Sequence, residues 1–272
     1  MRSSFTEQEI AAYRRDGFLT VKDFLTSSEL DHWREVVDAA VADERAQTGT
    51  LRTDVFTQRM QLRQTSADVR QLVTDPLLGR VAAELEGVDA NRIYLDQALV
   101  KEAYGSPTQY HLDGPWWPFD STHACTIWVA LDDSTLENGC LYFVPGSHRL
   151  GLSTAGDLGP DVGAVFAVHP EAAMPPTPSP VPAGGCSIHN ARTVHGAGAN
   201  MTPGRRRAMT AAFMPDGVRF NGTQDVRSLG EHYLASLTVG DPLENDGLNP
   251  IVYSGSEGLS LRKEPFRRAA SG

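Results

Sequence analysis

The sequence predicts a mainly β protein with flanking helices, built on a double-stranded β-helix, or jelly-roll, core. Residues up to about 90 carry helix-start signals and helical periodicity, whereas short apolar runs separated by turn residues begin near residue 91. Helices followed by many short strands are typical of a jelly roll with helices packed on one sheet. We expect one domain over residues 1–272, with a largely helical part at 1–90, the β core at 91–215 and a C-terminal extension at 216–272.

The N-terminal part contains two capping boxes, in which a threonine is followed three residues later by a glutamate. The first begins at Thr6 and predicts a short helix that ends at Gly17, after which a strand is expected at residues 18–21. The second begins at Thr26 and predicts a longer helix. Apolar residues recur along it at helical spacing, so its buried face is expected to be core and not a site.

A third helical region is expected over residues 66–85, with a restart at Pro76 and a stop at Gly87. Residues 52–64, which precede it, have no clean period. We expect them to form a loop or an irregular strand near the mouth of a pocket.

From residue 91 the pattern is one of short strands. Asn138-Gly139 indicates a hairpin between two of them. Residues 170–182 contain six prolines and almost no charge, and they predict either an ordered lid or a spacer with no role in the reaction. The expected strands cover residues 94–100, 111–117, 125–132, 140–145, 163–169, 186–190, 194–196 and 206–214.

The composition is that of an ordinary globular protein, with 40% hydrophobic and 21% charged residues. No apolar run approaches the roughly 20 residues needed to span a bilayer, and the N-terminus lacks the apolar stretch of a secretory signal. Three widely spaced cysteines do not suggest a disulfide framework, so we expect a reducing cytoplasm. A net charge of −10 argues against nucleic acid as a partner. The oligomeric state is not predicted.

The most informative short pattern is His111-Leu112-Asp113, which His195 joins far downstream. In a strand, residues i and i+2 point to the same face, so the histidine and the aspartate can chelate one metal while Leu112 points away. Two histidines and one carboxylate leave the opposite face of an octahedral ion open, an arrangement that suits Fe(II). His189, also in an expected strand, is the alternative distal histidine.

Further segments accompany this pattern in a fixed order. They are Asp16-Gly17-Phe18, Gln109 to Asp113, the aromatic run that follows, the apolar strand from Cys125, Asn138-Gly139, Cys140 to His148, His195 to Asn200, and Arg205 to Ala208. Together they resemble the phytanoyl-CoA dioxygenase family of Fe(II)/2-oxoglutarate oxygenases, over roughly residues 5–215.

The resemblance implies a cupin-like jelly roll that uses Fe(II), 2-oxoglutarate as co-substrate and O2. It implies His195, and not His189, as the distal ligand, because Arg206 follows His195 by the family's usual interval of eleven residues. In halogenating relatives a small residue replaces the carboxylate. Since Asp113 is present, oxygenation is expected instead.

Arg206 is the expected anchor for the far carboxylate of 2-oxoglutarate, because a planar guanidinium can bind a carboxylate with two parallel hydrogen bonds. Period two places Arg206, Ala208 and Thr210 on one face of a strand and the neighbouring arginines on the other. The resemblance adds Trp128, Thr126 and Gln97 as residues of the co-substrate pocket. One departure is Ala197, where the family commonly has serine, so one hydrogen bond to the co-substrate is expected to be missing.

The substrate pocket is expected next to the metal motif. Trp116 and Trp117 lie between two prolines, which disfavour a regular strand, and Phe119 follows the second proline, so we assign all three aromatics to the pocket wall. Gln109 would share the face of His111. The resemblance implies an oxidoreductase that oxidises a C–H bond of a small, partly apolar metabolite. Hydroxylation is the default outcome, with desaturation, epimerisation, cyclisation and epoxidation open.

A natural-product pathway is the expected setting. Two alternatives remain: a metal-binding cupin-like barrel without catalysis, and an oxygenase that uses the same triad without 2-oxoglutarate. Arg206 favours an Fe(II)/2-oxoglutarate oxygenase over both alternatives, because neither of them needs an anchor for 2-oxoglutarate.

Overall fold

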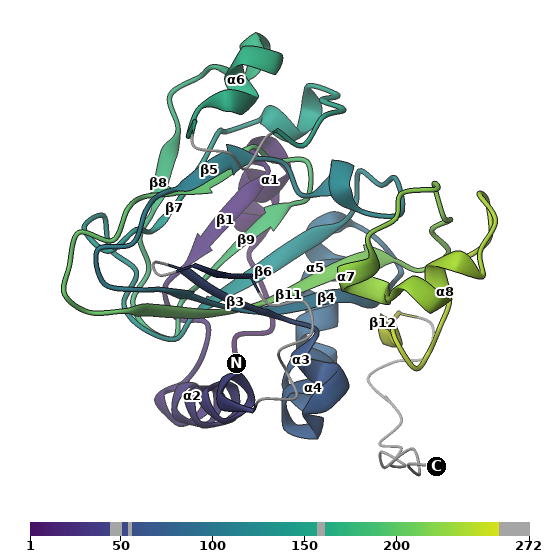
Figure 1. Cartoon of the computed structure of the whole chain (residues 1–272), viewed down its shortest axis with the longest axis horizontal. Coiled ribbons are helices and arrows are strands. Elements are labelled where there is room, and N and C mark those ends of the chain that lie inside the picture. Colours follow the sequence, from purple (N-terminus) through teal and green to yellow (C-terminus); the bar gives the residue numbers. More distant parts are fainter. Residues whose placement is uncertain (44–50, 54–55, 157–160, 256–272) are drawn as a thin grey trace.

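The computed structural model contains two antiparallel sheets with helices on one side of the larger sheet, as Figure 1 shows. The structure describes residues 1–43, 51–53, 56–156 and 161–255. The predicted jelly-roll core with flanking helices is confirmed. Within the described ranges, no helix is long and apolar enough to cross a membrane.

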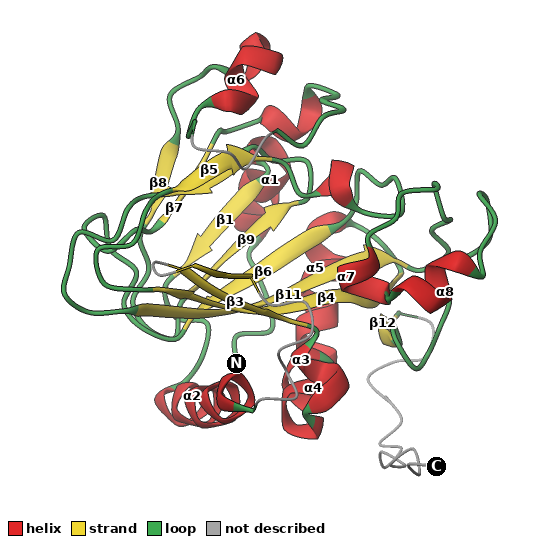
Figure 2. Ribbon diagram, in the orientation of Figure 1, coloured by secondary structure: helices red, strands yellow, loops and turns green. Residues whose placement is uncertain are grey.

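The larger sheet has the strand order β1-β9-β6-β11-β4-β3-β2, and β12 pairs with β4 beside this path. Strands from the N-terminal part therefore form both ends of this order, with β1 at one end and β2 at the other. Figure 2 shows the strands in yellow and the helices in red. The strands are β1 (Phe18–Val21), β2 (Leu51–Thr53), β3 (Phe56–Met60), β4 (Ala90–Lys101), β6 (Cys125–Ala130), β9 (Cys186–Asn190), β11 (Arg206–Pro215) and β12 (Ile251–Ser254).

The smaller sheet has the order β5-β10-β7-β8. Its strands are only three or four residues long: β5 (Thr108–His111), β7 (Leu141–Phe143), β8 (Thr177–Ser179) and β10 (His195–Ala197). The two sheets pack against each other through an apolar cluster that includes Trp128 and Ala208 from the larger sheet and Phe143 from the smaller. The space that this cluster leaves open holds the site described below.

The helices mostly follow the predicted start and stop signals. Thr6 and Thr26 both make complete capping boxes, and Gly17 and Gly87 end their helices with positive φ angles of 83° and 72°. Asp75 caps the restart at Pro76. The helices are α1 (Glu7–Asp16), α2 (Ser27–Ala42), α3 (Leu62–Thr65), α4 (Ala67–Val73), α5 (Pro76–Glu86), α6 (Ala164–Val168), α7 (Val226–Leu229) and α8 (Glu231–Ala235), with 3-10 turns η2 (Gly114–Trp116), η3 (Ser147–Arg149) and η4 (Pro170–Ala172).

The main core lies between the helices and the outer face of the larger sheet. Trp33 of α2 and Leu85 of α5 pack there against alternate residues of β11, such as Met209 and Phe213. Residues of the opposite parity, Ala208 and Ala212, belong to clusters on the other face. The period of two in β11 is therefore confirmed, and it fixes which side of the strand faces the second sheet.

Three sequence expectations are corrected. Residues 163–169, expected as a strand, contain the helix α6, because so short an apolar run carries no period that separates helix from strand. Residues 111–117 do not form one strand, since β5 ends at His111 and a 3-10 turn follows. Asn138-Gly139 does not join a hairpin, because β6 and β7 lie in different sheets and the turn carries the chain from one to the other.

The segment of residues 52–64 is more regular than expected. Within its described part it contributes strands β2 and β3 to the larger sheet, followed by α3. The proline-rich residues 170–182, by contrast, form η4 and β8, which pairs with β7. None of their side chains, all of which the structure describes, lines the cavity of the site.

Candidate active site

Two histidines face each other across neighbouring strands of the smaller sheet. His195 of β10 is the direct partner of His111 of β5 in the antiparallel register, and the centroids of their rings lie 4.3 Å apart. The register is interrupted between His195 and Ala197. Residues more than 80 positions apart in the sequence are therefore brought together by strand pairing alone.

Asp113 reaches the same place by a turn and not by strand parity. Leu112 is buried in an apolar cluster with Val144 and Val194, and Asp113 has helical backbone angles that lead into η2. The donor atoms of His111, Asp113 and His195 nevertheless lie within 4.8 Å of one another. The three predicted ligands are thus brought together, although the route of the chain between His111 and Asp113 differs from the one expected.

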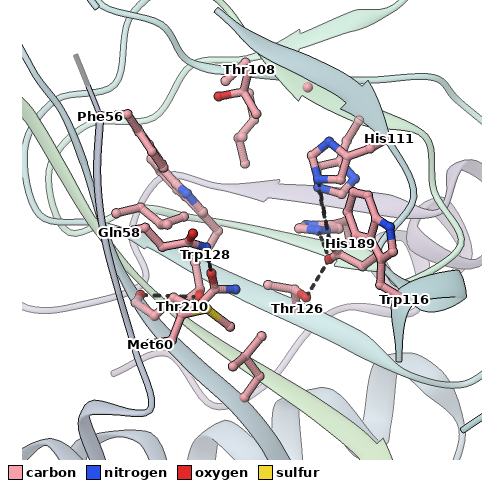
Figure 3. Close-up of a pocket in the computed structure, with 18 of the residues that line it drawn as sticks. Phe56, Gln58, Met60, Thr108, His111, Trp116, Thr126, Trp128, His189 and Thr210 are labelled. Atoms are coloured by element: carbon pink, nitrogen blue, oxygen red, sulfur yellow. Dashed lines mark hydrogen bonds and ion pairs between the residues drawn. The ribbon is translucent and has the colours of Figure 1, made fainter. Parts of the chain in front are cut away.

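The two carboxylate oxygens of Asp113 have different surroundings. Its Oδ1 lies 3.7 Å from Nε2 of His111 and 4.0 Å from Nε2 of His195. Its Oδ2 accepts a hydrogen bond from the Thr126 hydroxyl at 3.2 Å and lies 3.4 Å from Nε2 of His189, as the dashed lines in Figure 3 indicate. Oδ1 therefore faces the two histidines, while Oδ2 is held by residues of the larger sheet.

The orientation of both histidines is set by the main chain. Nδ1 of His111 donates to the Gln109 carbonyl at 2.7 Å, and Nδ1 of His195 donates to the Thr193 carbonyl at 3.0 Å. Because a carbonyl can only accept, each ring carries its proton on Nδ1 and presents a lone pair on Nε2. Such an outer hydrogen bond is the usual way in which a metal-binding histidine is oriented.

The charges of the cluster suit a cation. Burial lowers the pKa of His111 to about 4, with a further contribution from His195, and burial likewise lowers the pKa of His195 to about 4. Burial alone would raise the pKa of the Asp113 carboxyl, but His195, His189 and His111 bring it well below its usual range. At neutral pH the cluster therefore offers two neutral imidazoles and one carboxylate, the donor set expected for Fe(II).

These groups open into a cavity of about 230 Å³ between the two sheets. Arg206 lies on its wall and is only 2% exposed. Within the described residues, its Nε and Nη1 atoms have no hydrogen-bond partner, and its guanidinium lies 5.0 Å from the centroid of the Trp128 ring. Burial lowers its pKa to about 10, so the side chain is still charged at neutral pH.

A buried guanidinium with unsatisfied donors is costly unless an anion or another acceptor binds it. Arg207, on the opposite face of β11, is already satisfied by ion pairs with Asp132 and Asp38. The cavity thus combines a donor set for a cation with a free, buried anion-binding group. Both features fit a divalent metal and a carboxylate ligand bound in the same cavity.

The other predicted residues of the co-substrate pocket also line the cavity. Gln97 of β4 accepts a hydrogen bond from Gln58 of β3. Thr126, expected to offer its hydroxyl to the co-substrate, donates it to Asp113 instead.

Of the predicted substrate residues, Trp116 and Trp117 line the cavity, and the ring centroid of Trp116 lies 5.3 Å from that of His111. Phe119 and Gln109 do not line it. Phe119 is buried against Tyr94 and bridges Phe220, while Gln109 acts through its carbonyl on His111. We therefore do not retain these two as substrate residues.

Several lining residues were not named from the sequence. Residues 52–64 were expected near the mouth of a pocket, and Phe56, Gln58 and Met60 of β3 do project into the cavity at a spacing of two, as Figure 3 shows, so their alternation was an available signal. Asp225, which directly precedes α7, and Arg227 of α7 line it as well, but they belong to the C-terminal extension, where no sequence pattern pointed to a site.

The chain matches the model of one protein family, described as phytanoyl-CoA dioxygenase, over residues 13–208. It is 28% identical over 165 residues to a methylphosphonate hydroxylase of Gimesia maris, covering 56% of this chain and 60% of that protein. The chain therefore spans less than two thirds of the length of this curated relative.

Two solved structures from nogalamycin biosynthesis are similar over almost their whole length. The non-heme alpha-ketoglutarate-dependent carbocyclase SnoK has a TM-score of 0.77 and 26% identity, covering 91% of this chain and 96% of that one. The epimerase SnoN, in complex with Fe3+, alpha-ketoglutarate and nogalamycin RO, has a TM-score of 0.74 and 32% identity, covering 90% and 98%.

Proposed function

Because the chain belongs to the phytanoyl-CoA dioxygenase family, we propose that it is an iron(II)- and 2-oxoglutarate-dependent oxygenase. His111, Asp113 and His195 would hold the iron, and Arg206 would hold the far carboxylate of 2-oxoglutarate. Iron, 2-oxoglutarate and O2 would together supply the oxidising power for attack on a substrate C–H bond. The protein itself would bind and orient the reactants and exclude water from the cavity.

The protein's own contribution follows from the contacts of these residues. The carbonyls of Gln109 and Thr193 orient the two imidazoles, so the metal side needs no rearrangement before binding. Thr126 and His189 hold Oδ2 of Asp113, which leaves Oδ1 for the metal. The donor set is therefore oriented before the metal arrives.

The co-substrate side is preorganised in a similar way. The ring of Trp128 lies beside the Arg206 guanidinium, and the strand β11 fixes the direction of that side chain. A carboxylate bound there would give the Nε and Nη1 donors of Arg206 the acceptors they lack.

The observation that carries this proposal is that Arg206 and the three donor groups open into one cavity. A metal-binding barrel without catalysis would have no need of a buried arginine with free donors. Titration of the anaerobic Fe(II) protein with 2-oxoglutarate tests the proposal, because a weak visible charge-transfer band requires both the metal and a keto acid bound to it through two atoms. Oxygen uptake coupled to succinate formation is the second measurement.

We expect the band in the wild-type protein and its loss, or its appearance only at much higher 2-oxoglutarate, in Arg206→Ala. Metal binding without any band would favour the non-catalytic barrel. Oxygen consumption without a band or succinate would favour an oxygenase that does not use 2-oxoglutarate.

For the reaction we propose oxidation of a C–H bond in a small, partly apolar metabolite, with hydroxylation as the default outcome. The aromatic wall of Trp116 and Trp117 supports an apolar substrate body. A tailoring step in a natural-product pathway is supported by the similarity to SnoK and SnoN, which are described as a carbocyclase and an epimerase of nogalamycin biosynthesis.

A further inference from the structure

The charged side chains of the cavity fall into two groups. Asp113 and Arg206 are used by the metal and the co-substrate under the proposed function. With a divalent metal (+2) and 2-oxoglutarate (−2), these two residues (−1 and +1) sum to zero. Asp225 and Arg227 also line the cavity, and the metal and the co-substrate need neither of them.

Asp225 is held in place at the start of α7. Its Oδ2 accepts a hydrogen bond of 2.5 Å from the Tyr94 hydroxyl, which also lies 2.7 Å from the Ser228 hydroxyl. Its main-chain carbonyl accepts the amide hydrogens of Ser228 and Leu229. The carboxylate is therefore oriented by a fully buried tyrosine, and does not move freely at the surface.

The charge of Asp225 has no counter-ion in the described part of the chain. No lysine, arginine or histidine nitrogen there lies within 4.0 Å of its carboxylate, and Arg227, two residues later, is exposed and makes no ion pair with it. Among the described residues, none donates a hydrogen bond to its Oδ1. The cavity wall thus presents a half-buried negative charge with one oxygen free to accept.

The surroundings of this carboxylate are apolar and aromatic. Trp117 packs on Tyr94 with ring centroids 4.9 Å apart, and Trp116, Met60 and Leu95 line the same cavity as Asp225 and the metal donors. Figure 3 shows Trp116 beside His111 and Met60 on the opposite wall. A substrate in this space would bury an apolar body against these residues and bring any polar group to Asp225.

We infer that the substrate carries a protonated amine on an apolar body, and that the carboxylate of Asp225 binds this amine. The inference rests on the proposed function, because it assumes that the metal and 2-oxoglutarate occupy Arg206 and the histidine side of the cavity. A partly desolvated carboxylate without a counter-ion is most readily satisfied by a cation that also donates hydrogen bonds. The aromatic faces of Trp116 and Trp117 favour the same charge.

Arg227, the other charged residue that the metal and the co-substrate do not need, would favour an anionic substrate, but its side chain is exposed. Its exposed guanidinium is hydrated by solvent, so it loses little when no anion binds it. An anionic substrate would need Arg227 as its main contact and would leave Asp225 uncompensated within the cavity. Asp225 is more buried than Arg227, so its negative charge favours a cationic over an anionic substrate.

The test uses three probes that share a phenyl ring on a three-carbon chain and differ in charge: 3-phenylpropylamine, 3-phenylpropanol and 3-phenylpropanoate. Their dissociation constants are measured by calorimetry or ligand-observed NMR on the full chain loaded with Zn(II) and 2-oxoglutarate, which cannot turn over. Asp225→Asn preserves the size of the side chain and an acceptor for Tyr94. Asp120→Asn, at an exposed residue that does not line the cavity, is the matched control for the loss of one negative charge.

We expect the amine to bind wild type at least ~10-fold more tightly than the alcohol, in line with the strength of hydrogen bonds to charged groups. This preference should vanish in Asp225→Asn and persist in Asp120→Asn. Equal binding of amine and alcohol, or binding of none of the three probes, overturns the inference. Preferred binding of the carboxylate, lost in Arg227→Gln, also overturns it and points to an anionic substrate.

The wild-type comparison of amine and alcohol decides the matter even if Asp225→Asn does not fold. Failure of the proposed function is recognised separately. It would appear as the absence of the 2-oxoglutarate charge-transfer band, which does not depend on Asp225.

Discussion

The two sheets that enclose the cavity are built differently. The smaller sheet contributes His111 and His195 from strands of three and four residues, one of them with an interrupted register. The larger sheet contributes Arg206 from a strand of ten residues that pairs with β4 along its whole length, with a register shift between Ala212 and Phe213, far from Arg206. Short strands that end at the cavity let the chain turn at once, whereas a long strand with unbroken register around Arg206 fixes the direction of the side chains there by parity.

The two sheets form two walls of the cavity, and each wall carries a different part of the site. The wall of short strands positions the metal donors, two of them by strand pairing and one, Asp113, by a turn. The wall of long strands positions the groups that would bind 2-oxoglutarate, among them Arg206, Trp128 and Gln97. Substitutions on the first wall should therefore change metal affinity. Those on the second should change co-substrate affinity, except at Thr126 and His189, which contact Asp113 from that wall.

The largest expected effect is on the short-stranded wall. Replacing His195 with alanine should lower metal affinity by more than ~100-fold, because loss of a supporting residue alone typically costs ~10–100-fold, and it should abolish turnover. Calorimetric titration with Co(II) or Zn(II) measures the affinity directly. His189→Ala, next to the same cluster, should retain metal with reduced affinity. If His195→Ala kept metal and activity while His189→Ala lost both, the distal ligand would be His189.

Next in size is the effect of Arg206 on the long-stranded wall. Arg206→Ala should raise the KM for 2-oxoglutarate at least ~10-fold, since each hydrogen bond to a charged group contributes about 1.5–3 kcal/mol. The affinity for Co(II) without co-substrate should stay the same.

Arg207→Ala is the matched control, because that side chain faces away and pairs with Asp132 and Asp38. It should lower the free energy of unfolding and leave the KM unchanged. A raised KM in Arg207→Ala with a silent Arg206→Ala would mean that the side chains of β11 point the other way.

A smaller effect is expected where the two walls touch. Thr126→Val preserves shape but removes the hydroxyl that donates to Oδ2 of Asp113. Because His189 still contacts that oxygen, metal affinity should fall by ~10-fold or less, near the low end for supporting residues. Thr210→Val, on the same wall but hydrogen-bonded to the Gln97 carbonyl, should leave metal affinity unchanged. An equal loss in both variants would show that the effect is one of packing.

The smallest effect on the site is expected from Glu86, which lies outside both walls. Burial raises the pKa of its carboxyl to about 7, although hydrogen bonds from Tyr13 and Asn190 oppose the shift. Between the unfolded value of 4.5 and about 7, the folded protein holds a proton that the unfolded chain has lost. Stability from this group is therefore fully present below pH 4.5 and is lost as the pH rises to about 7.

The expected loss is about 3 kcal/mol at most, from 1.36 kcal/mol per pKa unit. Denaturant titrations at a series of pH values measure it. Glu86→Gln should flatten the fall in the free energy of unfolding across that window, while metal and 2-oxoglutarate affinities stay unchanged. A slope as steep in Glu86→Gln as in wild type would assign the dependence to another group.

Much of the fold could be predicted from the sequence, because those elements depend on local sequence signals. The capping boxes at Thr6 and Thr26, and the apolar strand at residues 186–190, appear in the structure as expected. The failures lie where distant contacts decide. Residues 164–168 are helical although two of the five are valines. Asn138-Gly139 connects two sheets, which no local pattern distinguishes from a hairpin.

The site divides in the same way. The sequence pointed to the triad and to Arg206, whose side chains the structure gathers around one cavity, while their roles as ligands and anchor remain predictions. It could not indicate Asp225, since only the folding of the C-terminal extension over Tyr94 brings that residue to the cavity. Nor could it show the turn at Asp113, which depends on the burial of Leu112 among residues far along the chain.

The edge strand β8 limits how a further strand can pair with the smaller sheet. It forms one border of the smaller sheet, where Pro178 pairs opposite Tyr142 and Pro176 and Pro180 flank it. Prolines have no amide hydrogen, so this border offers few donors to a further strand and discourages edge-to-edge aggregation. The protection matters most during folding, because strands paired over long sequence distances assemble slowly and leave edges exposed meanwhile. The prolines of β8 thus leave few free amide donors at the edge of the sheet that carries His111 and His195 during folding.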